Sequence, residues 1–289
     1  MADITFIGTR PQWWDHVAPL ANTVKAHGAF DYWRCFPPGD APTREGLRYA
    51  ASKGPVVAAS WDDAMTAHKA GARNIVLMEH GAGQSYSTRH RSYPGGQDRH
   101  KLALVLAPNE QAAARHRKFY RNDPKVVIVG CPKLDAVHGL EPKPCGYPPV
   151  VAVSWHWDCK VSPEAGTAWS YNRTPLVGPA MLDELVRMRD LGVIQLIGHA
   201  HPRIMDEITP VYREREVPIV TFEEVMLCAD LYMIDNSSTL FEFAALDRPV
   251  IVVDSPRYRP GVRHGLRFWT HANIGVRISE PSDVARAVM

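Results

Sequence analysis

The sequence predicts an α/β protein made of two domains, each with a parallel sheet covered by helices. Short apolar runs alternate with amphipathic helical segments along the chain, which is typical of parallel sheets covered on both faces. The length of 289 residues allows two domains of about 140 residues each. Residues 138–148 are dense in proline and glycine and predict a linker. We therefore expect an N-terminal domain over 1–140 and a C-terminal domain over 149–289.

The elements of the first half follow from local pattern. Gly71 stops one helix and Asn109 caps another. The apolar runs predict strands at 4–8, 32–36, 55–60, 74–78, 102–107 and 126–130. The helices between them are predicted at 11–26, 44–52, 62–69 and 109–121.

The second half repeats the alternation. Strands are predicted at 150–154, 193–197, 218–221, 231–234 and 250–253. Helices are predicted at 176–189, 204–215, 222–229, 240–245 and 282–289.

Composition restricts the class of protein. A content of 45% hydrophobic and 22% charged residues fits a folded globular chain, and a net charge of +2 leaves anionic partners to local patches. The cysteines are odd in number, scattered and without a CxxC pair, which indicates a reducing compartment and no zinc site. Neither a signal peptide nor an apolar run of about 20 residues is present, so we expect a cytoplasmic protein with no transmembrane segment.

A polar turn follows the predicted strand 231–234 and precedes a helix. Asn236, Ser237 and Ser238 suit the N-cap of that helix, whose first N–H groups and hydroxyls could bind a phosphate or diphosphate. Glu242, one turn further on, could reach a ribose or a base edge. The alternative is an ordinary capped helix without a ligand.

Histidines follow three other predicted strands. Ligands of open parallel sheets lie beyond the carboxyl ends of strands. His80 stands at such an end before a glycine-rich run, and could take a proton from a hydroxyl near neutral pH. His156 is a candidate for phosphate or leaving-group contact. His199 and His201 form an H-x-H pair, but no carboxylate or cysteine stands at ligand spacing, so we expect no metal site. For His80, a buried structural role is the alternative.

The polar loop 85–101 combines basic and aromatic side chains. Arg89, Arg91 and Arg99 are candidates to bind an anionic acceptor, such as a polyol-phosphate chain or nucleic acid. The alternative is solvated surface charge.

Four short motifs, in order, resemble those of CDP-glycerol glycerophosphotransferases, the teichoic-acid polymerase family. They are E-H-G-A-G, V-G-C-P-K-L-D, H-P and D-N-S-S-T-L-F-E, at residues 79–83, 129–135, 201–202 and 235–242. The resemblance implies a glycosyltransferase-B fold, with two Rossmann-like domains whose parallel sheets face a central cleft. It also implies that His80 is the catalytic base and that His201 contacts the donor diphosphate. Ala82 and Lys133 depart from that family's Thr or Ser and Arg.

The opening F-I-G-T-R-P-Q resembles a second family, the non-hydrolysing UDP-GlcNAc 2-epimerases, which share this fold. This resemblance implies that Arg10 lies near the nucleotide, although a loop arginine beside a helix is an equal interpretation. The acidic motifs of those epimerases are absent, although Asp62, Asp63 and Glu79 are present.

Together these observations predict a transferase. It would move a sugar or polyol-phosphate group from a UDP- or CDP-linked donor to an acceptor hydroxyl, without a metal or a cofactor. The acceptor could be modified DNA or a polyol-phosphate. A UDP-sugar 2-epimerase and a non-catalytic domain that binds a nucleotide or polymer are the alternatives. The donor's identity and the oligomeric state stay open.

Overall fold

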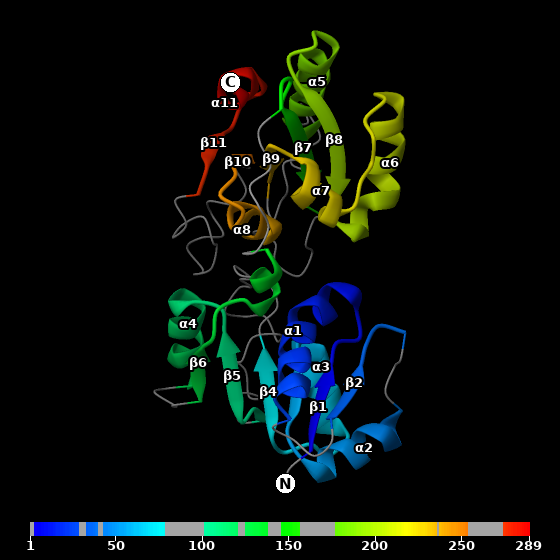
Figure 1. Cartoon of the computed structure of the whole chain (residues 1–289), viewed down its shortest axis with the longest axis vertical. Coiled ribbons are helices and arrows are strands. Elements are labelled where there is room, and N and C mark those ends of the chain that lie inside the picture. Colours follow the sequence, from blue (N-terminus) through cyan, green and yellow to red (C-terminus); the bar gives the residue numbers. More distant parts are fainter. Residues whose placement is uncertain are drawn as a thin grey trace. The chain divides into compact units, whose positions relative to one another are not determined.

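The structure is a computed structural model of the whole chain, and it divides into two compact units, Met1–Gly139 and Leu140–Met289 (Figure 1). It describes residues 3–28, 33–39, 43–78, 101–120, 125–137, 146–156, 177–235, 237–253 and 274–289. Most of the predicted linker, 138–145, lies outside these ranges.

The first unit contains a six-stranded sheet in the order β2-β1-β3-β4-β5-β6. Every described strand pair in it is parallel, as predicted. Its strands are β1 (Ile4–Ile7), β2 (Trp33–Phe36), β3 (Val56–Ala58), β4 (Ile75–Met78), β5 (Leu104–Ala107) and β6 (Val126–Ile128). Its helices are α1 (Pro11–His27), α2 (Arg44–Lys53), α3 (Trp61–Lys69), α4 (Glu110–Tyr120) and the 3-10 helix η2 (Pro132–Ala136).

Successive residues of these strands face opposite sides of the sheet, and both sides are covered. Phe6 belongs to the cluster on the α1 side, together with Trp13 and Val17. Its neighbour Ile7 belongs to the cluster on the other side, which includes Leu47 of α2. A strand buried on both faces must be apolar throughout, which is why the continuous apolar runs predicted this sheet correctly.

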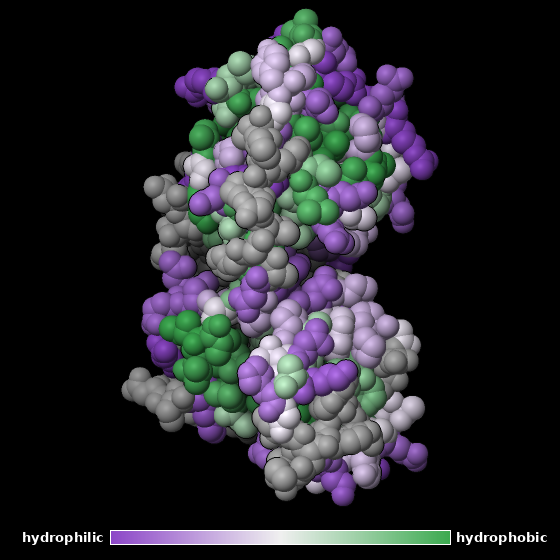
Figure 2. Space-filling view, viewed as in Figure 1, coloured by the Kyte–Doolittle hydropathy of each residue, from purple (hydrophilic) through white to green (hydrophobic). Residues whose placement is uncertain are grey.

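The edge strand β6 is the most exposed part of this sheet. Val127, Ile128 and Val129 are 45%, 41% and 43% exposed. Figure 2 shows apolar residues in green over this side of the unit. Among the described strands only β5 pairs with β6, which makes β6 an edge strand of the described sheet.

The second unit contains a five-stranded parallel sheet in the order β11-β10-β9-β7-β8. Its strands are β7 (Val150–Trp155), β8 (Gln195–Ala200), β9 (Leu231–Ile234), β10 (Val250–Val253) and β11 (Val276–Ile278). Its helices are α5 (Val177–Asp190), η3 (Pro202–Ile204), α6 (Met205–Glu214), α7 (Phe222–Cys228), α8 (Thr239–Ala244), η4 (Pro281–Asp283) and α11 (Val284–Val288).

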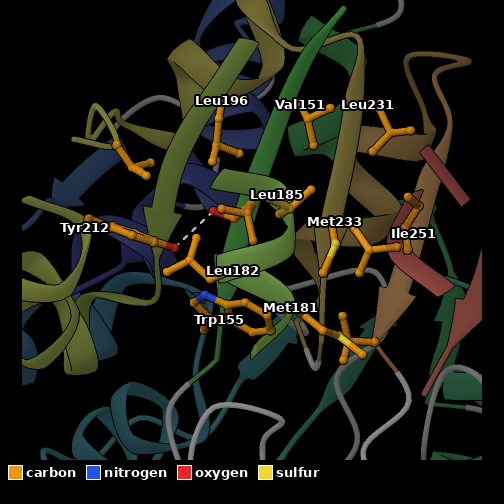
Figure 3. Packing of buried hydrophobic residues seen from close by; sticks show 14 of the residues in the cluster. Val151, Trp155, Met181, Leu182, Leu185, Leu196, Tyr212, Leu231, Met233 and Ile251 are labelled. Carbon is orange, nitrogen blue, oxygen red and sulfur yellow. Dashed lines mark hydrogen bonds between the residues drawn. The ribbon is translucent and has the colours of Figure 1, made fainter. Parts of the chain in front are cut away.

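The core of the second unit lies between the sheet and helices α5 and α6. Trp155 is fully buried there among Met181, Leu185 and other apolar side chains (Figure 3). The ring of Tyr212 packs closely on β8 at Gly198. A Cβ at this position would stand only 2.7 Å from the ring, so the close contact requires a glycine. The Tyr212 hydroxyl donates to the carbonyl oxygens of Val153 and His199 at 3.3 and 2.9 Å. These contacts hold β7 and β8 together just before their carboxyl ends.

Two predicted strands of the second unit differ from the structure, and a third strand was missed. β8 extends to Ala200 rather than ending at Ile197, because it pairs with β7 along its full length. The predicted strand 218–221 is a single bridge from Ile219 to Gly198. β11 was not predicted, since its three residues carry too short a pattern. Among the described helices, none combines the length and the apolar character that crossing a bilayer requires.

Candidate functional site

The candidate site lies at the carboxyl ends of the neighbouring strands β7, β8 and β9. Trp155 pairs with Ala200 in register, so the residues that follow, His156 and His201, emerge side by side. Their rings meet edge to face, with centroids 4.9 Å apart and planes at 63°. Ser237 and Ser238 follow β9, the other neighbour of β7. The structure therefore brings these four predicted residues to one edge of the sheet.

Backbone hydrogen bonds fix both histidines. The His201 N–H donates to the carbonyl of Trp155 at 3.1 Å. The His156 N–H donates to the Asp235 carboxylate at 2.8 Å. Asp235 is fully buried, so this bond lies out of water and ties the end of β7 to the end of β9. A rigid set of strand ends is what a preorganised binding site needs.

The protonation of His201 is set by its surroundings. The Arg203 backbone N–H donates to its Nδ1 at 3.1 Å, which places the hydrogen of the neutral ring on Nε2. Burial, followed by the nearby charges of His156, Arg203 and His199, lowers the pKa of His201 to about 3. His201 is therefore neutral near pH 7, with an N–H donor at Nε2.

This shift predicts an acid-sensitive stability. The pKa of His201 lies at about 3 in the folded protein against an ordinary 6.5, so between these values the unfolded chain takes up a proton that the folded protein does not. The stability that neutral His201 contributes to the folded protein is complete above pH 6.5 and is lost as the pH falls toward 3. In this pH range, we expect the free energy of unfolding, measured in urea, to change less steeply with pH in His201→Gln than in the unchanged protein.

The matched control is the exposed His27 on α1. His27→Gln removes one exposed imidazole and serves as the reference for that loss. An equal flattening in both variants would contradict the assignment to His201.

His199 has a different environment from the one that its H-x-H spacing suggested. It lies inside β8 rather than in a loop after it, which corrects the sequence prediction. Its Nδ1 lies 3.1 Å from the carbonyl oxygen of Val220 and donates to it, and its ring packs on Phe222 at 5.7 Å. Burial lowers the pKa of His199. Within the described ranges, no group of three or more His, Cys, Asp or Glu side chains could hold a metal ion.

The turn after β9 is shaped by serine and threonine hydroxyls. Ser237 Oγ accepts from the Thr239 N–H at 3.3 Å and from Thr239 Oγ1 at 2.9 Å. Ser238 is the N-cap of α8, yet its side chain makes no capping bond. The helix is only six residues long, and the N–H groups of Leu240 and Phe241 bond back to carbonyls of the turn. The predicted phosphate site at a helix start is thus better described as a cluster of hydroxyls.

Sequence reasoning missed Thr239 and Tyr232 at this site. The Tyr232 hydroxyl lies 3.2 Å from Thr239 Oγ1, and its ring packs on Phe243 and Phe222 at 5.2 and 6.0 Å. A tyrosine in an apolar strand reads as a core residue. The available signal was the alternation of side chains along the strand, which puts Tyr232 on the opposite face of the sheet from Met233.

Glu242 is buried, at 2% exposure, on the same side of the sheet as Tyr232. Burial raises the pKa of Tyr232, and the charges of Glu242 and Asp235 raise it further. The Glu242 carboxylate therefore acts on the phenol of Tyr232.

Arg10 belongs to the first unit, at the turn between β1 and α1. Its guanidinium lies over the Trp13 ring, 4.5 Å from the centroid, in a cation–π contact. The preceding residue, Thr9, donates from its N–H and its hydroxyl to the Asp63 carboxylate at 3.3 and 2.7 Å. This turn is thus tied to the start of α3.

The remaining predicted site residues lie outside the described residues. These are the proposed base His80, the donor-site candidate Asn236, and the acceptor-site candidates Arg89, Arg91 and Arg99. β4 ends at Met78, two residues before His80.

Solved structures resemble this chain over nearly its full length. The wall teichoic acid polymerase TagF matches with 15% identity and a TM-score of 0.62, over 98% of this chain and 78% of TagF. The MnaA–UDP complex from S. aureus matches with 14% identity and a TM-score of 0.61, over 99% and 87%. The UDP-GlcNAc 2-epimerase of Methanocaldococcus jannaschii matches with 14% identity and a TM-score of 0.60, over 100% and 92%.

These similarities confirm the predicted fold. The two Rossmann-like units with parallel sheets are those of the glycosyltransferase-B type, shared by the polymerase and the epimerases to which the motifs pointed. At such low identity they show the fold alone. No protein-family model and no curated protein matches the sequence.

Proposed function

We propose that the protein is a transferase that uses a nucleotide-diphosphate-activated donor, and that the second unit binds the donor's diphosphate. The observation that carries the proposal is the meeting of His156, His201 and Ser237 at the carboxyl ends of three adjacent strands. In open α/β sheets, ligands bind at such ends. Structures of the same fold have been determined with UDP and with CDPG.

The chemistry of these groups fits an anionic leaving group. The Nε2–H of His201 and the hydroxyls of Ser237 and Ser238 are hydrogen-bond donors. Donors held rigidly in a partly buried site stabilise the charge that grows on a departing nucleotide or diphosphate. In this proposal His80 removes the proton of the acceptor hydroxyl, Glu242 holds the ribose, and Asn236 and Arg10 add donor contacts.

The test is a binding measurement with CDP, UDP, GDP, ADP and dTDP by thermal shift and calorimetry. Ligand that binds only the folded state stabilises it by about 2.7 kcal/mol at 100 times its Kd, so a melting shift selective for one base is expected. His201→Ala should raise the Kd of that nucleotide about tenfold or more, since one hydrogen bond to a charged oxygen is lost. If no nucleotide shifts the melting point at millimolar concentration, the proposal is wrong.

A UDP-sugar 2-epimerase is the second candidate, because the epimerase of Methanocaldococcus jannaschii shares this fold with a TM-score of 0.60. The anchored Thr9–Arg10 turn would then contact the nucleotide. Incubation with UDP-GlcNAc, followed by proton NMR of the sugar, separates the two. Inversion at C2 without an added acceptor would favour the epimerase.

The acceptor in the transferase proposal is anionic. The basic residues Arg89, Arg91 and Arg99 within 85–101 support a polyol-phosphate or modified DNA. Turnover assays with each acceptor, at low and high salt, identify which of them is used.

A further inference from the structure

Three hydroxyl groups of the second unit form a connected chain. The first belongs to Tyr232 in β9, which is buried, at 0% exposure. Tyr232 contacts Thr239 at 3.2 Å, and Thr239 Oγ1 donates to Ser237 Oγ at 2.9 Å.

The direction of this chain follows from counting hydrogens. Each hydroxyl carries one hydrogen and can accept at its lone pairs. Thr239 gives its hydrogen to Ser237, so it can only accept from Tyr232. Tyr232 is therefore the donor of that pair and the first member of the chain.

Ser237 is the last member of the chain. Its oxygen already accepts from both the N–H and the hydroxyl of Thr239. No described residue accepts the hydrogen of Ser237, and the residue is half-buried rather than enclosed. Its hydrogen therefore remains as the terminal donor of the chain.

We infer that the chain Tyr232–Thr239–Ser237 orients the Ser237 hydroxyl as a hydrogen-bond donor, and that Ser237 meets a ligand oxygen that bears no hydrogen, such as a phosphoryl oxygen. The identity of that ligand rests on the proposed function. A sugar hydroxyl could accept from Ser237 but could not donate to its engaged oxygen, so a phosphate is the better fit. Tyr232 and Thr239 are positioning residues, because they act on the ligand through Ser237.

The surroundings strengthen the orientation. Hydrogen bonds in series polarise one another, and low dielectric strengthens each of them. Burial, followed by the charges of Glu242 and Asp235, raises the pKa of Tyr232, so the phenol keeps the hydrogen that the chain requires.

The first test is a double-mutant cycle on Thr239 and Ser237. It measures the Kd of the nucleotide, CDP or UDP, that the wild-type protein binds. Thr239→Val keeps the shape and removes the donor, and should weaken binding about three- to tenfold. Thr239→Ser keeps the hydroxyl and should bind as the wild type does. In a Ser237→Ala background, Thr239→Val should cause no further loss, because its effect passes through Ser237. Equal losses in both backgrounds would overturn the inference.

Tyr232→Phe extends the same cycle by one step. It should weaken binding less than Thr239→Val, because a phenylalanine leaves Thr239 able to donate to Ser237. Again no effect is expected in the Ser237→Ala background. A loss in that background would show that Tyr232 acts by packing.

The second test needs no ligand and so separates this inference from the proposed function. Neutron diffraction from the deuterated protein locates the hydroxyl hydrogens. We expect the Tyr232 hydrogen to point to Thr239, that of Thr239 to Ser237, and that of Ser237 away from both. A Thr239 hydrogen directed at Tyr232 would overturn the chain even if nucleotides bind. The expected positions without nucleotide binding would leave the chain intact and reject the proposed ligand.

Discussion

Replacing His80 by alanine is expected to lower the transferase turnover number about 10²–10⁴-fold, because general-base catalysis by a positioned side chain contributes that much. The nucleotide's Kd should stay unchanged, since we propose that the donor diphosphate binds to His201 and Ser237 of the second unit. Turnover is measured with the donor that the binding screen identifies, and Kd by calorimetry on the same preparation.

The matched control is His27→Ala, which removes an exposed histidine from the same unit. It should leave both turnover and Kd unaltered. Full turnover in His80→Ala would show that another group is the base. A loss of nucleotide affinity together with turnover would instead make His80 a donor contact.

The largest loss of stability is expected from Trp155→Ala. The side chain is fully buried in the core of the second unit, and truncating a buried tryptophan to alanine costs about 3–5 kcal/mol (Figure 3). Urea unfolding followed by circular dichroism measures the loss. The cost arises from lost apolar burial and from the cavity between β7 and α5.

Trp155→Phe tests how much of the loss comes from the missing side-chain volume. It refills part of the volume and should cost clearly less than the alanine variant. His156, the next residue, keeps its backbone bond to Asp235 in either case. A change of less than about 1 kcal/mol for Trp155→Ala would contradict the assignment of this residue to the core.

The parallel sheets and the strand-end histidines were predictable because their signals are local. Strands such as β7 and β10 are buried on both faces and therefore read as continuous apolar runs. In such sheets a polar residue directly after a strand lies at the ligand-binding edge. His156 could be assigned to that edge for this reason. His201 was chosen over His199 on the family resemblance, because the predicted strand ended at Ile197 rather than at Ala200.

The hydroxyl chain and the true place of His199 could not be predicted, because each depends on pairing between distant segments. β8 continues to His199 only because β7 pairs with it there, Ser154 opposite His199. Tyr232 and Thr239 meet because a short helix turns back over β9. Nothing in the local pattern of either residue carries this information.

The order of strands has a consequence for how the chain is made on the ribosome. Strand β7 pairs with β9, whose first residue, Leu231, pairs with Val151, 80 positions earlier. At a synthesis rate of about 5–20 residues per second, β7 waits roughly 4–16 s for this partner. The strands of the first unit are complete by Ile128, so its sheet can form while β7 is still being synthesised. During that delay chaperones can bind the apolar side chains of β7. Slower translation between β8 and β9 would lengthen the time for which they are exposed.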